Sequence, residues 1–416
     1  MSNAAQQQIP EGYKQTEIGV FPEDWGLTQI SKISHVVDSL HLTPTFSVDG
    51  YAMVRVADIK SGYLNLKTTL KVSDGVFKEF TRNYQPKKDD IVLSRVGSYG
   101  VSSYVNTDEE FCMGQNTVVI HSKISSKYLY YMLNSVATWQ QIEDGSYGSG
   151  YKSLSLKNIN ELHIPLAKEK EQTAISNALS DVDALITSLE KLIAKKRAIK
   201  TAAMQQLLTG KKRLPPFDQT HTGYKQTELG EIPEDWEVVE LEKLAHVRTG
   251  SMNNQDKVED GVYPFYVRSQ NVERINSYSY ECEAILVPGE GNIGNIFHYV
   301  NGRFDAHQRV YVIRQFDEEC SAKYIFYYMN ETFGRHAMEN SVKATVDSLR
   351  LPTFLGYKLA KPERLEEQMA IAAVLTDMDK EIKEVKQRLN KTQQLKQGMM
   401  QELLTGKTRL ITKTTS

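Results

Sequence analysis

The sequence lacks most of the features that mark a secreted, membrane-spanning or metal-dependent protein. Its 416 residues include only three cysteines, Cys112, Cys282 and Cys320, which are too scattered for a disulfide framework or a cysteine metal site. No apolar run is long enough for a membrane-spanning helix, and the N-terminal segment has no secretory signal pattern. These absences predict a reduced, cytoplasmic protein.

The motifs of self-contained catalysis are also missing. Residues 289–294 match G-x-G-x-x-G, but a strand-like segment follows where a dinucleotide loop needs a helix, so we interpret them as a glycine-rich connection. H-E-x-x-H, paired C-x-x-C, G-x-S-x-G and the Asn/Asp-Pro-Pro-aromatic motif of amino-methyltransferases are all absent. We therefore expect no catalytic, cofactor-binding or metal-binding residue in this chain.

Charge gives little indication of a partner. The formal net charge is −2, and 40% hydrophobic with 25% charged residues is ordinary for a globular protein. A neutral total is compatible with a local basic surface, so DNA binding is only weakly supported by composition. The length allows two or three domains.

The dominant feature that is present is an internal duplication. Residues 12–25 read GYKQTEIGVFPEDW and residues 223–236 read GYKQTELGEIPEDW, with eleven of fourteen positions identical. Residues 204–214 read MQQLLTGKKRL and residues 400–410 read MQELLTGKTRL, with nine of eleven identical. Two such matches in one order indicate a tandem pair of modules.

Each copy ends in a long segment with the alternating three- and four-residue spacing of a coiled-coil seam. Lys196 and Thr392 interrupt the seam at matching places, and Gly210 and Gly406 follow it as predicted C-caps. About 38 residues at about 1.5 Å each predict rods of roughly 57 Å. Equal length and shared register favour pairing of the two helices with each other, and packing of each helix on its own domain is the alternative. The predicted seam comprises Ile175, Leu179, Val182, Ile186, Leu189, Ile193, Ile199, Ala203 and Leu207 in copy one, and Ile371, Leu375, Met378, Ile382, Val385, Leu389, Leu395, Met399 and Leu403 in copy two.

Between marker and helix, each copy has the same order of short strand-like runs followed by an aromatic helix. This order predicts a mixed α/β domain on a shared scaffold, with Trp25 and Trp236 as core anchors that dock each domain on the helices. The expected strands are 52–56, 90–93 and 117–120, then 263–267, 284–287 and 309–313, and the expected helices are 127–134 and 323–330. The aligned pairs are Arg55 with Arg268, Asp58 with Asn271, Gly97 with Gly291, Gly100 with Gly294, and Gln115 with Gln308.

These markers resemble those of the specificity subunits of type I restriction–modification systems. The resemblance covers nearly the whole chain and is strong in the helices, which begin with Glu-Gln at 171–172 and 367–368 and end in LLTGK. Residues 91–97 (IVLSRVG) followed by 114–116 (GQN) are typical of a target recognition domain. Residues 285–291 match more loosely, and Pro288-Gly289 replaces the Ser94-Arg95 of copy one, so an arginine contact there does not carry over.

The resemblance implies an α/β (α+β) fold in which a long antiparallel two-helix coiled coil separates two globular target recognition domains, as a pseudo-twofold tandem repeat. The implied parts are an N-terminal conserved segment (1–25), target recognition domain 1 (26–165), a central conserved helix (166–214), a linker and repeated segment (215–236), target recognition domain 2 (237–360), and a C-terminal conserved helix and tail (361–416).

The resemblance also implies a function. Each domain reads one half of a bipartite site in double-stranded DNA, while the helices set the spacer and dock two modification subunits. Those subunits carry S-adenosylmethionine and methylate adenine at N6, and two restriction subunits with ATP and Mg²⁺ can join. The chain itself is then non-catalytic. The alternatives are a self-contained DNA methyltransferase or nuclease, and a coiled-coil adaptor that binds protein only.

Basic and amide side chains in or beside glycine-rich or irregular stretches are the candidates for DNA contact, because such groups hydrogen-bond base edges and phosphates. The alternative for each is a solvated surface residue. The aromatic residues of 127–134 are expected to pack and not to stack on bases. The predicted contacts are Arg55, Lys78, Arg82, Arg95, Ser98, Tyr99 and Asn116 in copy one, and Arg268, Asn271, Arg274, Arg309 and Lys343 in copy two.

Overall fold

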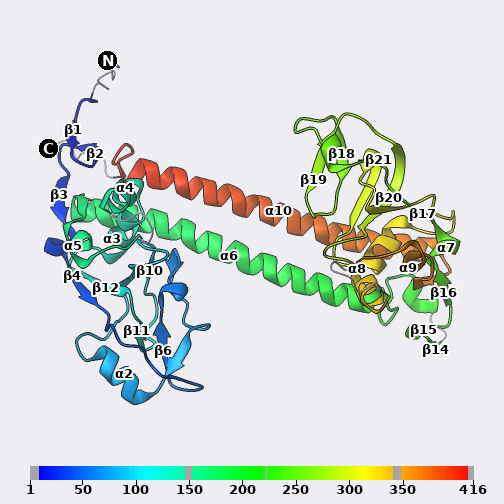
Figure 1. Ribbon diagram of the computed structural model, residues 1–416, viewed down its shortest axis with the longest axis horizontal. Helices are drawn as coiled ribbons and strands as arrows, with labels where there is room; N and C mark the ends of the chain where they lie inside the picture. Colours follow the sequence, from blue (N-terminus) through cyan, green and yellow to red (C-terminus); the bar gives the residue numbers. More distant parts are fainter. Residues whose placement is uncertain (1–8, 146–151, 221–222, 341–347, 411–416) are drawn as a thin grey trace. The chain divides into compact units, whose positions relative to one another are not determined.

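The computed structural model describes residues 9–145, 152–220, 223–340 and 348–410. It divides into two compact units, which are considered separately below. The first unit comprises residues 1–190 and 388–416, and the second comprises residues 191–387. Each unit therefore contains one mixed domain, the beginning of one long helix and the end of the other (Figure 1).

The first domain is built on two sheets. One has the strand order β4-β12-β9-β10-β7, and the other has the order β11-β6-β8-β5. Helix α3 (Ser126–Leu133) packs on the first sheet with all six of its residues from Tyr128 to Leu133 buried, so these aromatic side chains pack as predicted. The strands are β4 (Ser34–Asp38), β5 (Phe46–Ser47), β6 (Tyr51–Val54), β7 (Gly62–Tyr63), β8 (Leu70–Val72), β9 (Ile91–Ser94), β10 (Ser102–Tyr104), β11 (Phe111–Met113) and β12 (Thr117–Ser122), and the other helices are α1 (Ile30–Ile33), the 3-10 turn η1 (Val56–Asp58), α2 (Asp74–Thr81), α4 (Val136–Gly145) and α5 (Leu156–Glu161).

The second domain has one six-stranded sheet of order β17-β22-β20-β21-β18-β19. Its long helix α8 (Ala322–Glu339) occupies the place of α3, and both helices begin at a serine N-cap. The Ser125 and Ser321 hydroxyls accept the backbone N–H of Tyr128 and Tyr324 at 3.4 and 3.3 Å. The remaining elements are β17 (His246–Thr249), β18 (Tyr263–Tyr266), β19 (Val272–Ile275), β20 (Tyr280–Pro288), β21 (His298–Ala306), β22 (Val310–Arg314), α7 (Leu241–Leu244), η3 (Asn254–Asp256) and α9 (Leu351–Leu355).

Each repeated marker forms a two-stranded hairpin, and a second two-stranded sheet in each copy leads into a long helix. Strands β1 (Tyr13–Thr16) and β2 (Gly19–Pro22) form a hairpin, and β14 (Tyr224–Thr227) and β15 (Gly230–Pro233) form its equivalent. Strand β3 pairs with β13, which leads into the first long helix, and β16 pairs with β23, which leads into the second. These last strands are β3 (Gly26–Gln29), β13 (His163–Leu166), β16 (Trp236–Glu240) and β23 (Lys358–Pro362), and the linker carries the turn η2 (Phe217–Thr220).

All of the strands and aromatic helices expected from the sequence are present. Most of their ends differ by one or two residues, but β20 begins four residues earlier than expected and α8 continues nine residues further, to Glu339. The segment after Gly294 leads into β21 and not into a helix, which agrees with the glycine-rich connection. The sequence pattern did not predict the short strands β5, β7 and β8, because two or three residues carry too little periodicity. None of the helices within the described ranges is long and apolar enough to cross a membrane.

The two long helices pair with each other, as predicted. Helices α6 (Glu169–Leu207) and α10 (Leu365–Leu403) have 39 residues each. In the first unit, the Lys396 ammonium lies 2.6 Å from the Asp183 carboxylate, which joins the end of α10 to the beginning of α6. In the second unit, Lys200 and Asp379 make the same bond at 2.6 Å between the end of α6 and the beginning of α10. The pairing is therefore antiparallel in both units.

The predicted course of the seam is wrong at Ile199 and Leu395, which are 48% and 57% exposed. The three- and four-residue steps continue from Ile193 through Lys196 and Lys200 instead, so Lys196, which resembled an interruption, and Lys200 both occupy seam positions. They are accommodated because each ammonium has a carboxylate on the facing helix, with Lys196 bonded to Glu381 at 2.6 Å. Polar seam positions of this kind fix helix register at some cost in stability.

Candidate nucleic-acid interface and its mounting on the helices

Each domain is mounted on the helices by the tryptophan that ends the repeated marker. Trp25 and Trp236 are 1% and 0% exposed, and each belongs to a core that includes residues from both long helices. The Trp25 indole N–H donates to Glu171 Oε2 at 3.0 Å. The Trp236 indole N–H is buried without a hydrogen-bond partner among the described residues. The expectation that both tryptophans act as core anchors is confirmed.

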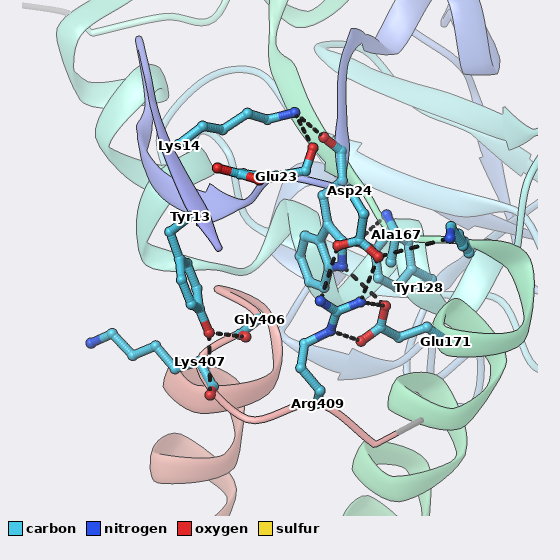
Figure 2. A network of polar contacts seen from close by, with 12 residues as sticks. Tyr13, Lys14, Glu23, Asp24, Tyr128, Ala167, Glu171, Gly406, Lys407 and Arg409 are labelled. Carbon is cyan, nitrogen blue, oxygen red and sulfur yellow. Dashed lines mark hydrogen bonds and ion pairs between the residues drawn. The ribbon is translucent and has the colours of Figure 1, made fainter. Parts of the chain in front are cut away.

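An arginine from the second repeated marker closes the first unit (Figure 2). The Arg409 guanidinium donates through Nε to Glu171 Oε1 at 2.5 Å and through Nη1 to Asp24 Oδ1 at 3.0 Å. Its hydrogen bond to Asp24 lowers the pKa of that carboxyl below its ordinary value. The Tyr13 hydroxyl donates to the carbonyl of Gly406 at 2.8 Å, so the turn that follows α10 is tied to the first hairpin.

The second unit has an equivalent arginine–carboxylate cluster, and we call each of these two clusters a clasp. The side chains of the second clasp are more deeply buried. The Arg213 guanidinium donates through Nε to Glu367 Oε1 at 2.8 Å and through Nη1 to Asp235 Oδ1 at 3.0 Å. The Arg213 and Glu367 side chains are only 3% and 1% exposed. Because the pair is buried, removing either partner would leave the other charge without a counter-ion, which costs more than breaking a surface pair.

A second repeated cluster joins each aromatic helix to the helix pair. In the first unit, the Tyr131 hydroxyl donates to Asp183 at 2.7 Å, and the same carboxylate holds Lys396. In the second unit, the Tyr327 hydroxyl donates to Asp379 at 2.9 Å, and that carboxylate holds Lys200. Burial and the neighbouring carboxylate raise the pKa of both tyrosines, so their hydroxyls remain protonated donors. Each mixed domain is thus bonded to one long helix directly and to the other through the shared carboxylate.

The candidate contacts of the first domain are partly engaged within the domain. Arg95 is only 17% exposed, and its Nη1 lies 2.7 Å from Asp38 while its Nε donates to the Leu154 carbonyl at 3.0 Å. Such a guanidinium has few donors left for DNA. The Arg55 side chain is 38% exposed. Its Nε donates at 3.0 Å to Asp58, which lies in the turn that follows β6.

The other predicted residues of the first domain are spread over several elements. Lys78 pairs with Asp74 on α2 at 2.7 Å, and Arg82 is the C-cap of that helix. Ser98 and Tyr99 lie in the loop after β9, where the Tyr99 hydroxyl donates to Glu143 at 2.7 Å. Asn116 has a φ of +61° and directly precedes β12. Its backbone carbonyl accepts the backbone N–H of Arg95.

The second domain brings two of its predicted contacts together. The Arg268 and Arg309 guanidiniums lie 3.1 and 3.2 Å from the two oxygens of Glu290. Their side chains are 48% and 59% exposed, and Glu290 is 23% exposed. Planar guanidiniums presented in this way match the O6 and N7 acceptors of guanine and also match phosphate. No local sequence signal marks Glu290, because its partners Arg268 and Arg309 lie about 20 residues away along the chain.

The remaining candidates of the second domain lie elsewhere. Arg274 on β19 donates to the carbonyls of Gly261 and Val262 at 2.9 and 2.6 Å. Asn271 accepts the Ser269 hydroxyl at its carbonyl, at 3.0 Å. Lys343 lies outside the described residues.

The structural register corrects one alignment between the copies. Gly114 N–H donates to Val54 O at 2.8 Å, and its equivalent, His307 N–H, donates to Tyr266 O at 2.9 Å. Residue 56 therefore corresponds to Arg268, and the sequence alignment of Arg55 with Arg268 is one residue out. The two arginines matched in sequence because each follows a valine, whereas hydrogen bonding between parallel strands decides which positions are equivalent.

Two buried histidines lie near the arginines of the second domain. His298 is 8% exposed, and burial lowers its pKa. His307 is 6% exposed, and burial together with the positive charges of Arg268 and Arg309 lowers its pKa as well. Both rings are therefore neutral near pH 7, and His307 Nδ1 accepts the backbone N–H of Arg309 at 3.0 Å. No group of three His, Cys, Asp or Glu side chains in the described parts of the chain is arranged to hold a metal ion.

Two diverged domains, each clasped to a shared antiparallel helix pair, define a tandem recognition protein. The family described as type I restriction modification DNA specificity domain matches residues 28–200 and 233–394, once for each copy. The chain belongs to this family of type I restriction–modification specificity subunits.

Individual relatives align with this chain along nearly its full length. The putative type I restriction enzyme MjaX specificity subunit of Methanocaldococcus jannaschii is 28% identical, with 97% of this chain and 98% of the relative covered. The MjaVIII specificity subunit of the same organism is 24% identical over 96% of each chain. Among solved structures, the type I S subunit of M. genitalium superposes with a TM-score of 0.63 at 17% identity, covering 91% of this chain and 96% of that one.

Proposed function

We propose that this chain selects a bipartite site in double-stranded DNA, and that each domain reads one half of it. The observation that carries the proposal is the contrast between equivalent positions on one scaffold. Arg268, Glu290 and Arg309 of the second domain correspond to Val56, Val96 and Asn116 of the first. Apolar and amide groups suit contacts to thymine methyl and adenine, whereas guanidinium suits guanine. Two domains that differ in this way would read different sequences.

The helix pair is the proposed ruler and docking platform. Helices α6 and α10 each continue through both units without a break, and 39 residues at about 1.5 Å each make a rod of roughly 58 Å. These contacts would transmit the spacing to the domains, because each domain is bonded to one helix directly and to the other through a shared aspartate. In this proposal two modification subunits dock on the complex, bind S-adenosylmethionine and methylate adenine at N6 after extruding the base. Restriction subunits with ATP and Mg²⁺ would join in the same cytoplasmic complex, and this chain would contribute no catalytic group.

Domain exchange tests the proposal. The chain is purified with its modification subunits, and the methylated sequences are determined on a randomised DNA library. Replacing residues 26–165 by the corresponding domain of a relative should change one half-site and leave the other half-site and the spacer unaltered. Adding one heptad to both helices should change the spacer alone.

Three outcomes would contradict the proposal. A complex without any sequence preference would refute DNA selection and favour a protein-only adaptor, particularly if DNA binding did not fall steeply with salt. Methyl transfer by the isolated chain would favour an enzyme. A heptad insertion that altered a half-site but not the spacer would refute the ruler.

A further inference from the structure

The strongest unassigned feature is the ionic cluster Arg268–Glu290–Arg309 of the second domain. Its members come from three loops: the loop after β18, the loop after β20 and the connection between β21 and β22. One carboxylate serves both arginines, with Arg268 Nη1 on Oε2 at 3.1 Å and Arg309 Nη1 on Oε1 at 3.2 Å. Each guanidinium has five N–H donors, so most of its donors remain for a ligand.

The backbone holds the carboxylate in place. Gly289 N–H donates to Arg309 O at 2.8 Å, and Gly289 O accepts the N–H of Leu349 at 2.8 Å. A Cβ at Gly289 would lie 2.8 Å from the ring of Tyr311, so only glycine allows the loop to approach this closely. Glu290 itself forms a β-bridge with Ser348. The glycine-rich connection of residues 289–294 thus carries a carboxylate whose position is determined on both sides.

The charge balance favours base contacts over phosphate contacts. Two arginines alone would carry a charge of +2 toward the DNA backbone, and Glu290 reduces this and repels phosphate. A carboxylate is counterproductive for non-specific attraction, which depends on positive charge alone. It is useful where the plane of a guanidinium must be set, because bidentate contact with guanine O6 and N7 requires a defined orientation.

We infer that Glu290 is a positioning residue that orients Arg268 and Arg309 to read guanine in the second half-site. The inference rests on the proposed function and deepens it, since it names the bases that one domain selects. The first domain offers no such cluster: its equivalent positions are Val56 and Val96, and Gly97 there lies against the Val56 side chain. The prediction is therefore confined to one half of the target.

The test uses the complex with modification subunits and a library randomised in both half-sites. Arg268→Ala and Arg309→Ala should each lose discrimination at one guanine of the second half-site, by about 5- to 150-fold. Glu290→Gln should lose discrimination at both positions. It should also bind non-specific DNA more tightly, because a negative charge has been removed. The first half-site should be unchanged throughout, and Glu290→Asp should restore part of the preference.

A matched control is available in the same domain. Glu281 pairs with Arg303 at 3.0 Å, with side chains that are 57% and 48% exposed, so Glu281→Gln removes a comparable surface ion pair. It should leave the base preference at both half-sites unaltered. If the arginine variants weakened all targets equally and kept the guanine preference, or if the second half-site contained no guanine, the inference would be overturned. A wild-type complex without any sequence preference would instead overturn the proposed function.

Discussion

The buried clasp of the second unit should be the most sensitive polar contact in the molecule. Arg213→Met removes a guanidinium from a pair whose side chains are 3% and 1% exposed, and it leaves the Glu367 carboxylate buried without its counter-ion. Breaking a buried ion pair in this way costs about 3–5 kcal/mol. Arg409→Met is the matched variant of the first unit. Its guanidinium is 31% exposed, and Glu171 keeps the indole of Trp25 as a donor, so we expect a loss of about 1–2 kcal/mol.

The difference can be measured unit by unit. Hydrogen exchange with mass spectrometry, over increasing urea, reports the free energy of opening for peptides from 204–214 and 365–375 separately from those of the first unit. Arg213→Met should destabilise only the second unit. The double variant Arg213→Met/Glu367→Leu should recover most of the loss, because no buried charge then remains. An equal or smaller effect of Arg213→Met than of Arg409→Met would refute the argument from burial.

Three further predictions concern two glycines near the end of α10 and the titration of a buried histidine. Gly406→Ala should destabilise the first unit by more than about 1–2 kcal/mol in urea unfolding, because φ is +69° and the new Cβ would lie 2.4 Å from Pro22. Gly398→Ala, with open space around a helical position, should instead stabilise it by about 0.5–1 kcal/mol, and a loss would contradict the helix there. Because burial lowers the pKa of His298 below 6.5, the unfolded chain binds protons more readily, so the second unit should lose stability as the pH falls from about 6.5 through the folded pKa. His298→Gln should flatten part of that dependence in thermal unfolding, the rest arising from His307, and an unchanged slope would disprove the assignment.

The two long helices show what a repeating sequence pattern can predict and where it fails. Ile175, Leu179 and their equivalents recur with a period that only a helix seam produces, so the existence, length and pairing of both helices could be predicted. The pattern failed at Ile199, because an apolar residue near an interruption resembles a resumed seam. The charged neighbours Lys196 and Lys200 belong to the seam only because Glu381 and Asp379 face them, and those partners come from the other end of the chain.

The candidate interface was less accessible to sequence reasoning. Residue type made Arg95 and Arg309 equal candidates, since both are arginines beside a glycine-rich loop. Folding pairs Arg95 with Asp38 and buries most of the Arg95 side chain. It pairs Arg268 and Arg309 with Glu290 but leaves both arginine side chains about half exposed. No local signal distinguishes these cases, because the deciding carboxylates lie 57 and about 20 residues away along the chain.

The sequence by itself determined the duplication, the two mixed domains and the paired long helices, because repetition and periodicity can be read directly from the chain, and the family resemblance implied their antiparallel direction. Only the tertiary structure decided that Arg213 and Arg409 close the units, that lysines occupy the helix seam, and that one glutamate orients two arginines. Ion pairs depend on distances of a few ångströms between residues that are remote in sequence, and burial sets their strength. Both quantities arise only when the chain has folded.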